Sequence, residues 1–124
     1  MNYKVSVDKI FSAAHALREY RGKCERLHGH NWKVRLTVSG SRLNKIGMVA
    51  DFSEMKNCLE GILGDLDHRC LNETAAFKTI NPTAENIASC ILRKAVKILK
   101  LPKGIKVSKV SVWESENSFA EASL

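Results

Sequence analysis

Residues 28–39 of the chain read HGHNWKVRLTVS and alternate between two classes of side chain along their whole length. The even-numbered positions carry the apolar residues together with two histidines: His28, His30, Trp32, Val34, Leu36 and Val38. The odd-numbered positions carry Asn31, Lys33, Arg35, Thr37 and Ser39. Successive side chains of a β-strand point to opposite faces of its sheet, so this alternation predicts a strand with one face buried in a core.

The segments on either side of this strand predict further elements. Upstream, residues 3–15 (YKVSVDKIFSAAH) are rich in Val, Ile, Phe and Ser and favour a neighbouring strand. Downstream, residues 48–50 are expected to form a short extended piece before a helix that begins at Asp51. Asp51 and Glu54 form a D-x-x-E capping pattern. The apolar stripe of this first helix comprises Met55, Leu59, Ile62, Leu63 and Leu66.

The second half of the chain predicts a loop, a second helix and a hairpin. Residues 66–82 (LDHRCLNETAAFKTINP) lack periodicity and predict a long loop, and such loops are often functional in compact domains. Thr83 is then the expected N-cap of a second helix that ends near Pro102. Its stripe comprises Ile87, Ile91, Leu92, Val96 and Leu99. Residues 105–124 are rich in β-branched side chains around a polar centre and predict a closing hairpin.

These elements predict a single α+β domain over residues 1–124, with the order ββααββ. The length of 124 residues is enough for one core without disulfides. The 4 cysteines are irregularly spaced and are expected to be reduced thiols, and the chain shows neither a membrane span nor a signal peptide, so we expect a cytoplasmic protein. Two exposed sheet edges would remain, and oligomerisation is one way to cover them.

The net charge of +7 favours an anionic partner. A phosphate ester and a nucleic acid both fit, and so does a solvated basic face, because lysines recur along the second helix and its exit loop. Aromatic residues make up only 6% of the chain and do not interleave with the basic run, which argues against a platform for single-stranded nucleic acid.

The histidines carry the first chemical signal. His15, His28 and His30 form an H-x12-H-x-H arrangement, and the last two share the apolar face of the central strand. A buried imidazole without a partner is costly, and a metal ion would satisfy all of these rings. Three neutral imidazoles that converge at one end of a sheet are typical of an open zinc site. Ordinary hydrogen-bonded histidines are the alternative.

Three further positions could take part in proton transfer or binding. Cys24 lies beside Arg21, Lys23 and Arg26, whose charges would favour its thiolate, although an incidental loop cysteine fits equally well. An Asp67–His68 pair could act as an acid–base group, or simply be a surface dipeptide. Glu114 has the parity of its apolar strand neighbours and needs a partner if it points inward, such as a ligand edge with two parallel N–H donors. A strand-end glutamate turned to solvent fits equally well.

Taken together, six stretches resemble the pterin synthases of the tunnelling fold in order and over nearly the whole chain. They are FSAAH (11–15), CERLHGHNW (24–32), VADF (49–52), LDHRCLN (66–72), NPTAEN (81–86) and VSVWES (110–115). The short C-x3-H-G-H spacing looks like the branch that makes 6-carboxy-5,6,7,8-tetrahydropterin for queuosine synthesis, whereas 6-pyruvoyl-tetrahydropterin synthases usually have a longer gap.

The resemblance implies a role for each matching residue. His15, His28 and His30 would bind one Zn²⁺ per subunit. Cys24 would accept a proton, Asp67 and His68 would form a relay on the opposite side, Glu114 would anchor the pterin ring and join the relay, and Thr83 would add a pterin contact.

The substrate and assembly also follow from the resemblance. The substrate would be 7,8-dihydroneopterin triphosphate, and the products 6-carboxytetrahydropterin, acetaldehyde and triphosphate. An antiparallel four-stranded sheet with two helices on one face would close into a barrel in a trimer, and two trimers would stack as a homohexamer. A 6-pyruvoyl-tetrahydropterin synthase, an aldolase-type pterin enzyme and a non-catalytic anion- or RNA-binding relative are the alternatives.

Overall fold

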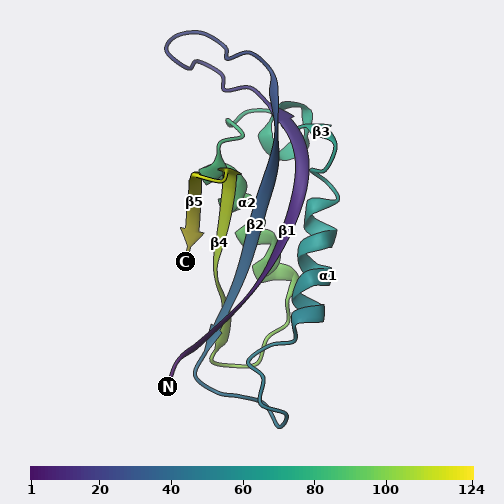
Figure 1. The fold of residues 1–124 in the computed structure, drawn as a ribbon, viewed down its shortest axis with the longest axis vertical. Helices are drawn as coiled ribbons and strands as arrows, with labels where there is room; N and C mark the ends of the chain where they lie inside the picture. The colour runs from purple at the N-terminus through teal and green to yellow at the C-terminus, as the bar shows by residue number, and fades with distance from the viewer.

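The computed structural model describes residues 1–124, and Figure 1 shows a long, twisted sheet flanked by helices. The strands are β1 (Tyr3–His15), β2 (His28–Gly40), β3 (Arg69–Cys70), β4 (Ile105–Ser115) and β5 (Ser118–Ser123). The helices are α1 (Phe52–Leu63) and α2 (Ala84–Ile98), with short 3-10 turns at Leu71–Glu73 and Ala75–Phe77. The expected α+β class and the order of the main elements are confirmed.

The sheet has five strands in the order β3-β1-β2-β4-β5. Pairing is antiparallel between β1 and β2, β2 and β4, and β4 and β5, as predicted for the four long strands. The expectation of a purely antiparallel, four-stranded sheet is wrong, because β3 adds a parallel edge where Arg69 pairs with Ala13 and Cys70 with Ala14. The expected extended piece at residues 48–50 is not a strand of the sheet, since Val49 and Ala50 form bends. A strand as short as β3 forms only when neighbouring contacts hold it against the sheet.

Both helices begin at the predicted caps. Asp51 accepts a hydrogen bond from the backbone N–H of Ser53 through Oδ1 (2.7 Å), and Thr83 accepts one from Asn86 through Oγ1 (3.1 Å). Such side-chain acceptors satisfy N–H groups that have no partner inside the helix. The predicted stripe of α2 is wrong at Val96, which is 43% exposed, whereas the neighbouring Ala95 is fully buried.

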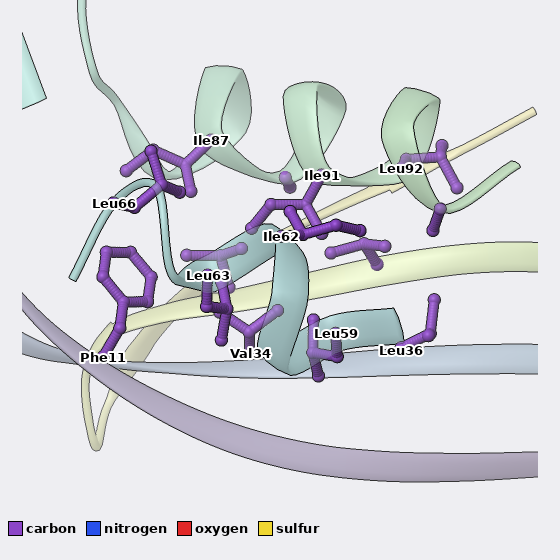
Figure 2. Packing of buried hydrophobic residues seen from close by; sticks show 14 of the residues in the cluster. Phe11, Val34, Leu36, Leu59, Ile62, Leu63, Leu66, Ile87, Ile91 and Leu92 are labelled. Carbon is purple, nitrogen blue, oxygen red and sulfur yellow. The ribbon is translucent and has the colours of Figure 1, made fainter. Parts of the chain in front are cut away.

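The core lies between the sheet and both helices. Figure 2 shows Phe11, Val34 and Leu36 of the sheet facing side chains of α1 and α2. The labelled helix residues are Leu59, Ile62, Leu63, Ile87, Ile91 and Leu92. All of these side chains belong to a cluster of 25 buried residues, so the two helices cover one face of the sheet, as expected. No helix is both long and apolar enough to span a membrane.

The opposite face of the sheet carries polar and aromatic side chains. The Arg35 guanidinium donates two hydrogen bonds to Asp8, at 2.7 and 2.9 Å, and lies 5.1 Å from the centre of the Trp113 ring. The Lys33 ammonium lies over the same ring at 4.1 Å, which is a cation–π contact. Cross-strand pairs of this kind stabilise the register of β1, β2 and β4.

Candidate metal centre and proton-transfer groups

The register of β1 and β2 brings the three predicted histidines together. His15, the last residue of β1, pairs with His28, the first residue of β2, and His30 pairs with Ala13. The ring centres lie 4.7 Å apart for His15 and His28, 5.1 Å for His15 and His30, and 4.8 Å for His28 and His30. The structure therefore gathers all three imidazoles at one end of the sheet.

Backbone carbonyl groups set the tautomers of two of these rings. His15 donates from Nδ1 to the carbonyl oxygen of Pro82 (2.8 Å), and His28 donates from Nδ1 to that of Arg26 (2.8 Å). In a neutral imidazole the other nitrogen then carries a lone pair. The two Nε2 atoms lie 3.1 Å apart. Two nitrogens bound tetrahedrally to one Zn²⁺, with bonds of about 2.0–2.1 Å, would be separated by about 3.3 Å.

His30 completes the group and lacks a hydrogen bond where one is needed. Its Nε2 atom is buried and has no hydrogen-bond partner. Glu114 Oε1 lies 3.2 Å away, but not in hydrogen-bonding geometry. Burial lowers the pKa of His30, while the charge of Glu114 acts in the opposite direction. The neutral imidazole favoured by burial is the form that binds metals.

These observations fit a zinc ion held by three histidines. One potential ligand atom from each of His15, His28, His30 and Glu114 lies within 4.8 Å of the others. The lone pairs of His15 and His28 face each other, and the orphaned His30 nitrogen faces the same space. Trp32 forms the floor, with its ring centre 4.9 Å from that of His15 and 5.1 Å from that of His30.

Asp67 and His68 form a second polar group beside the candidate metal site. Asp67 accepts a hydrogen bond from the Ser12 N–H (2.9 Å), and His68 donates its own N–H to the Ser12 carbonyl oxygen (2.6 Å). The Asp67 carboxylate lies 3.0 Å from Nδ1 of His68. The Ser12 hydrogen bond is the main cause that lowers the pKa of Asp67. The pair predicted from sequence is therefore in contact.

The backbone at His68 presents its ring to solvent. His68 has a φ of +58°, a left-handed conformation that is unusual for a residue with a side chain. Its side chain is 80% exposed. His68 and His30 line one shallow groove, together with Gly29 and Asn31. The groove therefore places His68 near one member of the histidine cluster, His30.

Cys24 is not part of the cluster within a single chain. It is exposed and lies on the long loop between β1 and β2, which extends away from the body of the domain in Figure 1. The neck of this loop is closed by Leu17 and Glu25, through a bond from Glu25 N to Leu17 O (2.8 Å) and one from Leu17 N to Glu25 Oε1 (3.2 Å). Cys24 thus immediately precedes an anchored residue.

Thr83 has a structural role that is visible in the fold. Its hydroxyl caps α2, and the residue before it supplies the carbonyl that orients His15. Sequence reasoning missed this carbonyl of Pro82, that of Arg26, and the Glu25 anchor. A backbone carbonyl leaves no mark in residue type, so the only available signal was that Pro82 directly precedes a helix cap.

Comparison with known proteins identifies the family to which the chain belongs. The model of the family described as 6-pyruvoyl tetrahydropterin synthase matches residues 4–123. The chain belongs to this family. Its expected resemblance to the tunnelling-fold pterin synthases is therefore confirmed.

Three members of the family illustrate the range of relatives. A 6-carboxy-5,6,7,8-tetrahydropterin synthase of Haemophilus influenzae is 30% identical over 96% of this chain and 97% of its own length. A dihydroneopterin monophosphate aldolase of Pyrococcus furiosus is 38% identical over 92% of this chain and 91% of its own. The structure of Caenorhabditis elegans 6-pyruvoyl tetrahydropterin synthase superposes with a TM-score of 0.87 at 26% identity, covering 100% of this chain and 96% of that one. The chain is thus similar, over its whole length, to enzymes that act on pterins.

Proposed function

We propose that this family member is a zinc-dependent carbon–carbon lyase. It would convert 7,8-dihydroneopterin triphosphate and water to 6-carboxy-5,6,7,8-tetrahydropterin, acetaldehyde and triphosphate, as a step in queuosine precursor synthesis. The observation that carries the proposal is the convergence of the Nε2 atoms of His15 and His28, 3.1 Å apart, beside the buried Nε2 of His30, which has no hydrogen-bond partner. Similarity to the Haemophilus influenzae carboxytetrahydropterin synthase supports the choice of product.

His15, His28 and His30 would hold the metal. A zinc ion bound by three imidazoles keeps a position open for substrate oxygen, and it acidifies hydroxyl groups and polarises carbonyl groups there. The hydrogen bonds to Pro82 and Arg26 keep two of these rings in the ligand tautomer before any metal arrives. Such outer partners increase the basicity of a ligating imidazole and fix its orientation.

Proton transfer would be divided between two groups of the protein, one on each side of the side chain of the bound pterin substrate. The ionised Asp67 carboxylate keeps a proton on Nδ1 of His68, so that Nε2 can accept a proton or, in the imidazolium, return one. Cys24 would take a proton on the other side. Because Cys24 is exposed on its loop, its approach to a reacting carbon requires either movement of this loop or a site shared with another copy of the chain.

Glu114 would anchor the pterin ring. A carboxylate can accept two parallel N–H bonds from the 2-amino and N3 edge of a pterin, and such bidentate pairs are strong and directional. Glu114 is half exposed and lies at the mouth of the cluster, 3.2 Å from His30. A pterin ring bound to Glu114 would place the side chain of the substrate next to the candidate metal site. Thr83, beside the carbonyl that orients His15, is proposed as a further pterin contact.

The net charge of +7 is consistent with a polyanionic substrate. Lysines and arginines would increase the local concentration of the triphosphate and stabilise it as it leaves. With this substrate the enzyme would act in the cytoplasm.

A closed barrel of several chains is part of the same proposal. β5 stands at one edge of the sheet, and β3 covers only two residues of β1 at the other. Pairing between these edges in neighbouring copies would satisfy their backbone groups and give the proposed trimer, with a hexamer as a pair of trimers. Sedimentation of the purified protein at several concentrations measures this directly.

An aldolase acting on a dihydroneopterin phosphate is the second candidate. The Pyrococcus furiosus relative, at 38% identity, favours it. Both reactions would use a pterin anchor and acid–base groups, so the histidine cluster does not separate them. The difference lies in whether the phosphate group leaves and which fragment is released.

Product analysis by mass spectrometry distinguishes the candidates. The zinc-loaded protein would be incubated in parallel with 7,8-dihydroneopterin triphosphate and with the monophosphate, each with a chelator-treated control. Chelator-sensitive formation of 6-carboxytetrahydropterin and acetaldehyde from the triphosphate is expected. A pyruvoyl product, or aldol cleavage of the monophosphate, would assign the chain to another branch of the family, and no turnover with bound zinc would contradict a lyase function.

A further inference from the structure

Two asparagine side chains extend the hydrogen bonding of β1 beyond its last residue. Asn72 accepts from Ala16 N (2.9 Å) and donates to Ala16 O (2.7 Å). Asn81 accepts from Arg18 N (2.8 Å) and donates to Arg18 O (3.0 Å). Each carboxamide therefore pairs with both backbone groups of one residue, as a neighbouring strand would. The chain that follows His15 is held although no strand pairs with it.

The side chain of Arg18 adds hydrogen bonds between the chain that follows β1 and the loop that precedes α2. Its guanidinium donates to three backbone carbonyls, those of Ile80 (2.9 Å), Phe77 (2.7 Å) and Asn72 (3.2 Å). The Asn86 side chain also donates to the carbonyl of Asn81 (2.8 Å). Residues 77–81 are thus held against the end of β1 by side chains rather than by a regular ladder.

The residue that follows this contact carries the carbonyl group that orients His15, one of the proposed metal ligands. Pro82 follows Asn81 directly, and its oxygen accepts the proton of His15 Nδ1 at 2.8 Å. His15 is only 2% exposed, so no water can easily replace that acceptor. The bonds made by Asn81 and Arg18 hold the segment that leads directly to Pro82. Neither residue lines the groove beside His30 and His68.

We propose that Asn81 and Arg18 are positioning residues for His15, which they hold in the tautomer and orientation that bind zinc. The inference rests on the proposed zinc centre. In the absence of these residues the segment before α2 would shift, the Pro82 bond would weaken, and His15 would sample orientations that do not bind metal. Loss of an outer partner of a metal ligand typically weakens metal affinity by about 10- to 100-fold.

A purely structural role for Asn81 makes a different prediction. A variant that loses two backbone hydrogen bonds is destabilised with or without metal. If Asn81 only holds the fold, zinc would raise the melting temperature of N81A as much as that of the wild type. If Asn81 positions His15, the rise caused by zinc is smaller, because the stabilisation by a ligand depends on its affinity for the folded state.

Asn44 offers a matched control. Its side chain also makes two backbone hydrogen bonds, from Ile46 N and Met48 N, both at 3.0 Å. It lies just beyond the C-terminal end of β2, whereas the histidines lie at the N-terminal end of that strand. N44A therefore removes a similar number of bonds far from the proposed metal.

The experiment measures zinc affinity by competition with a chromophoric chelator, and melting temperature with and without zinc, for wild type, N81A, R18A and N44A. We expect about 10- to 100-fold weaker zinc binding in N81A and R18A, and wild-type affinity in N44A. If R18A fails to fold, N81A alone decides. Wild-type zinc affinity in a folded N81A would overturn the inference while leaving the zinc centre intact. Absence of zinc binding by the wild type would contradict both.

Discussion

His15 Nε2 and His28 Nε2 face each other at 3.1 Å, while Nδ1 of each ring donates to a backbone carbonyl. With both Nδ1 protons engaged, neither neutral ring has a hydrogen to place between the two Nε2 atoms. A shared cation satisfies both lone pairs at once. The strand register, the helix cap at Thr83 and the loop residue Arg26 together create this arrangement in one chain.

Replacing Cys24 by alanine separates chemistry from metal binding. We expect C24A to lose turnover by at least about 10²-fold, since a positioned proton acceptor contributes that much, and to keep its zinc. Steady-state rates and metal analysis of the same preparation check this. C90A is the matched control, because Cys90 lies on α2 among the residues that flank the core, and it should keep its activity. Loss of zinc in C24A would contradict the role given to the thiol.

The Asp67 carboxylate should be needed at every pH at which the enzyme works. The Ser12 N–H lowers its pKa, so it is ionised at neutral pH and stays so on acidification to well below the pKa of an imidazole. D67N is expected to lower kcat by about 10²- to 10⁴-fold across the whole profile. D65N, which changes an exposed carboxylate two positions away, should behave as the wild type. A D67N rate that recovers at any pH would contradict an orienting role.

Glu114 should matter for binding the pterin more than for holding the metal. E114Q keeps the size of the side chain but replaces one acceptor oxygen by an amide donor, so the paired N–H donors of the ring lose a partner. A hydrogen bond to a charged group contributes about 1.5–3 kcal/mol, which corresponds to roughly a 10- to 150-fold rise in KM. Metal content should not change.

E116Q, at an exposed position beyond β4, is the control for this variant. Loss of zinc in E114Q, together with wild-type behaviour of E116Q, would make Glu114 a metal ligand instead of a pterin anchor.

The Asp8–Arg35 pair on the uncovered face should give a small, pH-dependent contribution to stability. The hydrogen bonds from Arg35 lower the pKa of Asp8 in the folded state. The contribution is therefore present above the unfolded pKa of about 3.9 and is lost as the pH falls through the folded value. Both side chains are about 40% exposed, so D8N should cost less than about 1 kcal/mol near neutral pH.

Urea unfolding of wild type and D8N at pH 7 and pH 2 measures this contribution. The difference in the free energy of unfolding should vanish at pH 2. A larger difference at pH 2 than at pH 7 would contradict the assignment.

Much of this fold can be predicted from local sequence patterns. The alternation in β2 and the caps at Asp51 and Thr83 are properties of neighbouring residues, and they place β2 and the first turns of both helices correctly. β3 is different, because its two residues carry no periodicity. They pair with Ala13 and Ala14 of β1, next to the hydrogen bonds that Ser12 makes with Asp67 and His68.

The candidate site, too, has parts that local sequence patterns predict and parts that they do not. His28 and His30 share a strand face, so their proximity follows from β geometry alone. His15 joins them through the register of two long strands. The Pro82 carbonyl and the Asn81 contact depend on a loop that returns from more than sixty residues away, and no local rule predicts where such a backbone group will lie.

Zinc K-edge X-ray absorption on the reconstituted protein, combined with metal analysis, tests the central claim most directly. The account predicts one zinc per chain with three imidazole nitrogens at about 2.0–2.1 Å, and loss of that signal in H28A. A sulfur neighbour at about 2.3 Å would make a cysteine a ligand and contradict the division between His15, His28 and His30 as ligands and Cys24 as proton acceptor. Failure of the wild type to retain zinc would contradict the metal centre itself.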